Sequence, residues 1–148
     1  MAADRAERMN RILVAVSSAL AADRLVEPVA GLARMLSSDV LVVHVSRPSG
    51  GQTREQEEAD GERAVRSLQD GISAAGVSVQ TLLMFSDDIA RAILTTAEEQ
   101  RATLICLGLT GKNVFARLLA GNVPVELIRN TRIPVLLFPP DYKTPPTV

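Results

Sequence analysis

Residues 11–46 read RILVAVSSALAADRLVEPVAGLARMLSSDVLVVHVS and place two short apolar runs on either side of a helical pattern. The two runs, Arg11–Ser17 and Val40–Ser46, are rich in Val, which is typical of strands covered on both faces. Between them, apolar residues recur every three or four positions and predict a helix over Ala19–Leu36, kinked at Pro28 or beginning nearer to it. Two buried strands joined by a helix are typical of a parallel sheet.

The same alternation continues to the end of the chain. It predicts an open, doubly wound five-stranded parallel sheet, a Rossmann-like α/β fold with strand order 3-2-1-4-5 and helices on both faces. One domain is expected over residues 11–139, between polar tails at 1–10 and 140–148. The remaining expected elements are a long charged loop (Arg47–Glu62), a helix ending at Ala75-Gly76, a strand (Val77–Phe85), a helix after Ser86, a strand (Thr103–Leu109), a helix (Val123–Arg129) and a strand (Ile133–Phe138).

The composition excludes several classes of function. Of the 148 residues 47% are hydrophobic, and the net charge of −1 provides no field that would attract nucleic acid or anionic lipid. No apolar run approaches the roughly 18 residues that span a bilayer, so membrane insertion is not expected. The N-terminus lacks a secretory pattern, and the single cysteine suits a reducing compartment. These features predict a soluble cytoplasmic protein.

A glycine-rich segment follows the fourth expected strand. Gly108, Gly111 and Gly121 have the spacing G-x2-G-x9-G, and Asn122 follows as a suitable N-cap for the next helix. A Walker A loop is excluded, because Cys106 stands where its first glycine belongs. From spacing alone two interpretations remain open: the glycines admit a phosphate to free backbone N–H groups at a helix start, or they only allow tight turns.

The chain resembles the universal stress protein family over most of its length, roughly Arg11–Pro139. The resembling pieces are RILVAVSSA, DVLVVHV, IARAILTTAEEQRATLICLGLTG and GNVPVELIRNTRIPVLLFP. Nucleotide-binding members of that family carry G-x2-G-x9-G followed by Ser or Thr, a position that Asn122 occupies here.

The resemblance implies binding of ATP or another adenine nucleotide such as cyclic AMP, with any Mg²⁺ carried in by the nucleotide. Ser17 stands where those members usually have Asp; losing a charged hydrogen bond costs on the order of 1.5–3 kcal/mol, so weaker or retuned binding is expected. The implied nucleotide-binding residues are Val16, Ser17, Val45, Gly108, Gly111, Gly121, Asn122 and Val123.

The last expected strand, Ile133–Phe138, would expose apolar side chains and unpaired backbone groups at a sheet edge. The resemblance implies a homodimer through this strand; alternatively, Pro134 and Pro139-Pro140 blunt the edge. The implied function is a stress-response regulatory protein that binds a nucleotide without fast turnover. The alternative is a nucleotide-free dimeric module that regulates a partner protein such as a transporter. Enzymatic activity beyond slow ATP hydrolysis is not expected, since no acid/base pair emerges.

Three other features have structural interpretations. His44 is the only histidine, and it lacks neighbours at metal-ligand spacing, so it is expected to be structural and no metal site is predicted. Cys106 is expected to be a small core residue. Asp87-Asp88 are expected to cap a helix rather than to act as a carboxylate pair.

Overall fold

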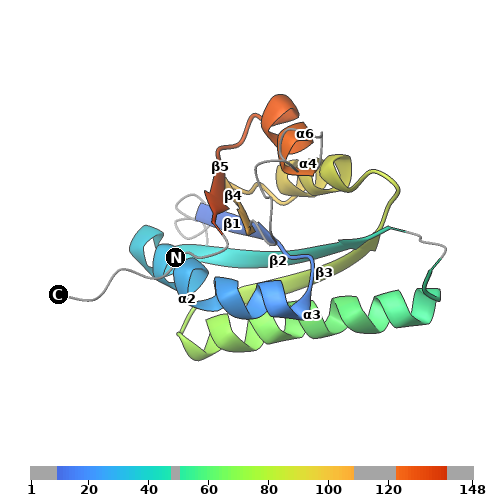
Figure 1. Ribbon diagram of the computed structural model, residues 1–148. Coiled ribbons are helices and arrows are strands. Elements are labelled where there is room, and N and C mark those ends of the chain that lie inside the picture. The colour runs from blue at the N-terminus through green and yellow to red at the C-terminus, as the bar shows by residue number, and fades with distance from the viewer. Residues whose placement is uncertain (1–9, 48–50, 109–122, 140–148) are drawn as a thin grey trace.

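The computed structural model describes residues 10–47, 51–108 and 123–139 (Figure 1). Five parallel strands form one sheet in the order β3-β2-β1-β4-β5, which confirms the predicted fold class and strand order. Where they are described, the elements run β1 (Asn10–Ala15), α2 (Ala19–Leu36), β2 (Ser38–Ser46), α3 (Arg54–Ala74), β3 (Val79–Phe85), α4 (Ile89–Glu99), β4 (Leu104–Gly108), α6 (Val123–Asn130) and β5 (Val135–Phe138).

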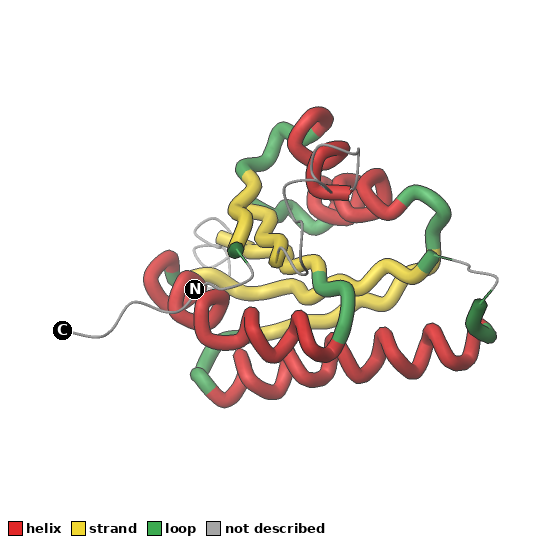
Figure 2. The backbone as a smooth tube through the Cα atoms, viewed as in Figure 1, coloured by secondary structure: helices red, strands yellow, loops and turns green. Residues whose placement is uncertain are grey.

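Helices cover both faces of the sheet, α2 and α3 on one and α4 and α6 on the other (Figures 1 and 2). The central strand β1 shows why this is so, because its side chains alternate between the two faces. Ile12 and Val14 pack with α2 and α3, and Leu13 packs with α4 and α6, all three with no exposed surface. Burial on both sides explains the nearly continuous apolar run.

Helix α2 begins at Ala19 and continues through Pro28, so the alternative of a later start is wrong. The Ser18 side chain caps it by accepting a hydrogen bond from Ala21 N at 3.1 Å. Helices α2 and α3 approach closely at Gly71, where an added Cβ would lie 2.5 Å from Cγ1 of Val26. The glycine therefore allows the contact between the two helices.

The expected loop over Arg47–Glu62 is wrong in its second half, because α3 already begins at Arg54. Thr53 accepts from Gln56 N, and the Gln56 side chain accepts from Thr53 N, which together form a capping box. The Arg54 guanidinium also lies 4.5 Å from the ring centre of Phe85 at the end of β3. The high charge of this segment belongs to a solvated helical face rather than to a loop.

Two minor expectations are confirmed. Cys106 lies in β4 with no exposed surface, and burial raises the pKa of its thiol from 9.0 to about 12. Asp88 caps α4, with its carboxylate accepting from Arg91 N at 3.1 Å. Within the described residues, no helix is both long enough and apolar enough to cross a membrane.

Candidate functional site

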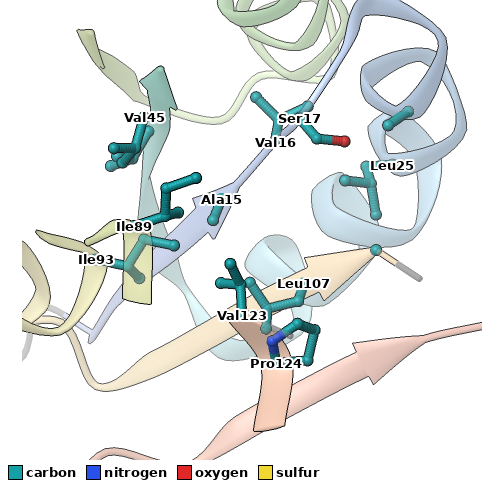
Figure 3. Close-up of a pocket in the computed structure, with 13 residues that line it drawn as sticks. Ala15, Val16, Ser17, Leu25, Val45, Ile89, Ile93, Leu107, Val123 and Pro124 are labelled. Atoms are coloured by element: carbon teal, nitrogen blue, oxygen red, sulfur yellow. The ribbon is translucent and has the colours of Figure 1, made fainter. Parts of the chain in front are cut away.

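A cavity of about 180 Å³ opens at the carboxyl ends of β1, β2 and β4 (Figure 3). The connection after β1 crosses one face of the sheet through α2, whereas the connection into β4 crosses the other face through α4. The cavity therefore lies where the winding direction reverses, which is the usual ligand position in open parallel sheets. The described residues that line it are Ala15, Val16, Ser17, Ala21, Leu25, Val43, Val45, Ile89, Ile93, Leu107, Gly108, Val123 and Pro124.

The cavity walls are almost entirely apolar. Among the described lining residues, Ser17 has the only polar side chain, and it lies at the exposed turn between β1 and α2. Isoleucines of α4 and Leu25 of α2 close the sides, while Val123 and Pro124 of α6 lie beside the end of β4 (Figure 3). Pockets for drug-sized ligands occupy roughly 300–1,000 Å³, so this cavity suits one apolar ring system rather than a whole nucleotide.

The structure brings together five of the eight residues predicted for the nucleotide site. Val16, Ser17, Val45, Gly108 and Val123 come from four separate segments of the chain and all line the cavity. The other three predicted residues, Gly111, Gly121 and Asn122, lie outside the residues that the structure describes.

Gly108 has a packing role that the spacing argument did not anticipate. A Cβ at this position would lie 3.2 Å from Cδ2 and 3.3 Å from Cδ1 of Leu25, tighter than ordinary van der Waals contact. The missing side chain therefore lets Leu25 approach the end of β4, and the two residues close one side of the cavity together.

A second, wider hollow of about 650 Å³ lies next to the cavity and shares Ile89 and Val123 with it. Its charged lining residues are Arg47, Asp87, Asp88 and Glu126. Asp88 is already engaged in capping α4. Across the described part of the chain, no group of three or more His, Cys, Asp or Glu side chains could hold a metal ion.

The sequence reasoning missed most of the apolar wall. Ile89 and Ile93 of α4 and Leu25 of α2 follow the same helical periodicity as residues of the core, so no sequence signal separates them from core positions. Ala15 could have been predicted from its position, because it directly precedes the predicted site residues Val16 and Ser17.

The chain is similar to known universal stress proteins. The model of the universal stress protein family matches residues 9–139. A curated relative, universal stress protein MJ0531 of Methanocaldococcus jannaschii, is 33% identical over 78 residues, which span 53% of this chain and 45% of that relative. The match thus covers less than half of the relative's length.

Solved structures show the same fold at low sequence identity. A universal stress protein from Archaeoglobus fulgidus has a TM-score of 0.74 at 23% identity, covering 93% of this chain and 98% of its own. A universal stress protein in complex with cAMP has a TM-score of 0.69 at 18% identity, covering 86% and 95%. An Archaeoglobus fulgidus universal stress protein in complex with dAMP has a TM-score of 0.67 at 22% identity, covering 87% and 96%.

The family model spans nearly the whole chain, and the strand order of the sheet is the predicted one. The protein belongs to the universal stress protein family.

Proposed function

We propose that this protein binds an adenine nucleotide, with the base in the apolar cavity, and acts as a regulatory protein without fast turnover. The observation that carries the proposal is the apolar cavity at the strand ends of β1, β2 and β4, with Ser17 at its rim. Family relatives in complex with cAMP and with dAMP support an adenine nucleotide as the ligand class.

The walls suit a flat, weakly polar base. Burying its faces against Val45, Ile93 and Leu107 removes apolar surface from water, which stabilises the complex by about 25 cal/mol per Å². The Ser17 hydroxyl can donate one hydrogen bond and accept others, so it suits the ring nitrogens or the sugar hydroxyls of a nucleoside. It offers no charge, in contrast to a carboxylate.

The place of the phosphates in this proposal rests on the sequence pattern alone. Gly108, Gly111, Gly121 and Asn122 would hold them through backbone N–H groups, and the helix dipole at the start of α6 favours an anion there. Any Mg²⁺ would arrive with the nucleotide.

The cavity is tested by filling it. Ala15 lies on β1 inside the cavity, so Ala15→Phe places a phenyl ring where the base would sit (Figure 3). Calorimetric titration with ATP, AMP and cyclic AMP should show binding to the unmodified protein and at least about tenfold weaker binding to the variant, a change of about 1.4 kcal/mol. Met35→Phe is the matched control, because Met35 is 79% exposed near the end of α2 remote from the cavity.

Binding heat that is unchanged by Ala15→Phe would place the nucleotide elsewhere. Absence of both heat and a thermal shift at millimolar nucleotide would reject the proposed function. Either result differs from a folding defect, which circular dichroism of Ala15→Phe would reveal.

A nucleotide-free interaction module is the second candidate, and the uncharged Ser17 side chain favours it. Both candidates include a homodimer. Its support is the edge strand β5, which carries Leu136 at 37% exposure, next to α6 with Ile128 at 51% exposure. Native mass spectrometry of freshly purified protein discriminates the candidates, because only the first expects nucleotide to accompany the dimer.

A further inference from the structure

Both ring nitrogens of His44 are engaged in hydrogen bonds inside the protein. Nδ1 lies 2.8 Å from the carbonyl oxygen of Val16, and Nε2 lies 3.0 Å from Oγ of Ser46. A carbonyl oxygen only accepts, so Nδ1 carries a proton and donates it to this bond. In the neutral ring, Nε2 then accepts from the Ser46 hydroxyl. The ring is thus fixed in tautomer and orientation.

The carbonyl of Val16 lies where the central strand leaves the sheet. The register of β1 with β2 ends at the pair Ala15 and Val43, and one further bond runs from Val16 N to Val43 O at 2.9 Å. The ladder thus stops before the Val16 carbonyl, which lies at a buried position and needs a donor. The imidazole of His44 supplies that donor from within β2.

Helix α3 holds the ring from its other side. A Cβ at Gly61 would lie 2.6 Å from Cδ2 of His44, so the glycine allows α3 to pack directly against the imidazole. With Ser46 at one ring nitrogen, Val16 at the other and α3 against the ring edge, His44 is only 9% exposed. These three contacts favour a single orientation of the ring.

We infer that His44 is a positioning residue for ligand binding, which fixes the cavity rim at Val16 and Ser17 through the Val16 carbonyl. This inference rests on the proposed function for its binding readout. The rim has two anchors: His44 holds the end of β1, and the Ser18 cap holds the start of α2. Between them lies Ser17, the polar side chain of the rim. Without the hydrogen bond from His44, the Val16 carbonyl must accept a hydrogen bond from water instead, and we expect the rim to shift.

The inference is tested with three variants. His44→Leu removes both ring bonds. His44→Asn keeps an N–H donor bonded to Cγ, as Nδ1 is, and therefore serves as the conservative rescue. Val40→Ala is the matched control, because Val40 is also buried on the same strand and the same sheet face, four residues away from His44 towards the opposite end of the sheet.

Two readouts separate positioning from general stability. Amide hydrogen exchange over residues 16–22 without ligand should accelerate in His44→Leu and stay as in the unmodified protein in Val40→Ala. The dissociation constant for AMP should rise about three- to tenfold in His44→Leu, the effect of one lost hydrogen bond, and recover largely in His44→Asn. Unchanged exchange over residues 16–22 in His44→Leu would overturn the inference. So would an equal weakening of AMP binding in Val40→Ala.

Two measurements keep the test decisive if His44→Leu does not fold. The ¹⁵N spectrum of the unmodified protein should show the His44 proton on Nδ1, and a proton on Nε2 alone would overturn the inference. Ser46→Ala removes only the hydroxyl bonded to Nε2, so the ring is held less firmly and exchange over residues 16–22 should rise above that of the unmodified protein. If AMP does not bind the unmodified protein, the proposed function fails, while exchange and tautomer still decide the role of His44.

Discussion

The two faces of the sheet are built differently. On one face the long helices α2 and α3 pack against the strands and against each other, with Gly61 and Gly71 at close contacts. On the other face lie the shorter helices α4, with 11 residues, and α6, with 8 residues. The cavity opens where the start of α2 meets α4 and α6 at the strand ends (Figure 3). We call the side of α2 and α3 the closed face, because only Ala21 and Leu25 of its helices reach the cavity, whereas the rest of the helical wall comes from α4 and α6.

This difference places close packing and an open cavity on one sheet. Close packing of α2 and α3 stabilises the fold most when the apolar contact is continuous, because each buried methylene adds about 0.8 kcal/mol to the free energy of unfolding. A binding cavity requires the opposite, because its walls have fewer neighbours. The closed face therefore holds the strands in place, while the strand ends line the cavity beside α4 and α6.

The largest effect should come from a truncation on the closed face. Leu68 of α3 has no exposed surface, and Leu68→Ala should lower the free energy of unfolding by about 2–5 kcal/mol. Ile93→Ala on α4 should cost about 2 kcal/mol, because that side chain already borders the cavity. Denaturation followed by far-UV circular dichroism measures both. Equal losses for the two variants would contradict a difference in packing between the faces.

The thiol of Cys106 reports how well the closed face excludes water. With its pKa raised from 9.0 to about 12, about one folded molecule in a thousand carries the thiolate at pH 9. Alkylation by iodoacetamide at pH 9 should therefore be hundreds of times slower than in denaturant. A cysteine at the half-buried cavity position 45, made as Val45→Cys with Cys106→Ala, should react far faster.

The same shift gives a pH dependence of stability. Below pH 9 the thiol is protonated in both the folded and the unfolded state and has no effect. Between pH 9 and about 12 the unfolded chain loses the proton first, so folding becomes less favourable as pH rises. Cys106→Ala should remove this contribution, and identical alkaline stability profiles for the two proteins would refute the shift.

The smallest expected changes in stability come from alanine substitutions at two helical glycines, which should have opposite signs. Gly31 of α2 has open space around a hypothetical Cβ, so Gly31→Ala should stabilise the protein by about 0.5–1 kcal/mol through helix propensity. Gly61→Ala has the same propensity gain but pushes against the fixed His44 ring at 2.6 Å, so a net loss of about 1 kcal/mol is expected. Thermal unfolding of both variants checks the signs. A gain at Gly61 would show that the ring yields.

The sheet could be predicted because its signals are local and repeated. Apolar runs at Arg11–Ser17 and Val40–Ser46 predict buried strands, and the alternation with helices restricts the possible topologies. The prediction for the start of α3 was wrong because a charged, Gly-rich segment is typical of a loop, whereas the capping box of Thr53 and Gln56 starts the helix there. The apolar cavity wall and the partners of His44 depend on contacts between distant segments, which one sequence does not reveal. The rule that ligands bind at the carboxyl ends of parallel strands points to the turns after Val16 and Val45, and the family resemblance assigned these residues to nucleotide binding.

The placement of β1 in the middle of the sheet has a consequence for synthesis. Its partner β4 follows about ninety residues later, and the bond from Thr103 N to Arg11 O marks where the two strands meet. A chain emerging from the ribosome can first assemble β1, α2, β2, α3 and β3, because these elements are consecutive. Until β4 emerges, one edge of β1 stays unpaired and the cavity has no fourth-strand wall. The nascent protein can therefore assemble these five elements before the cavity is complete, and the edge of β1 stays exposed during that interval.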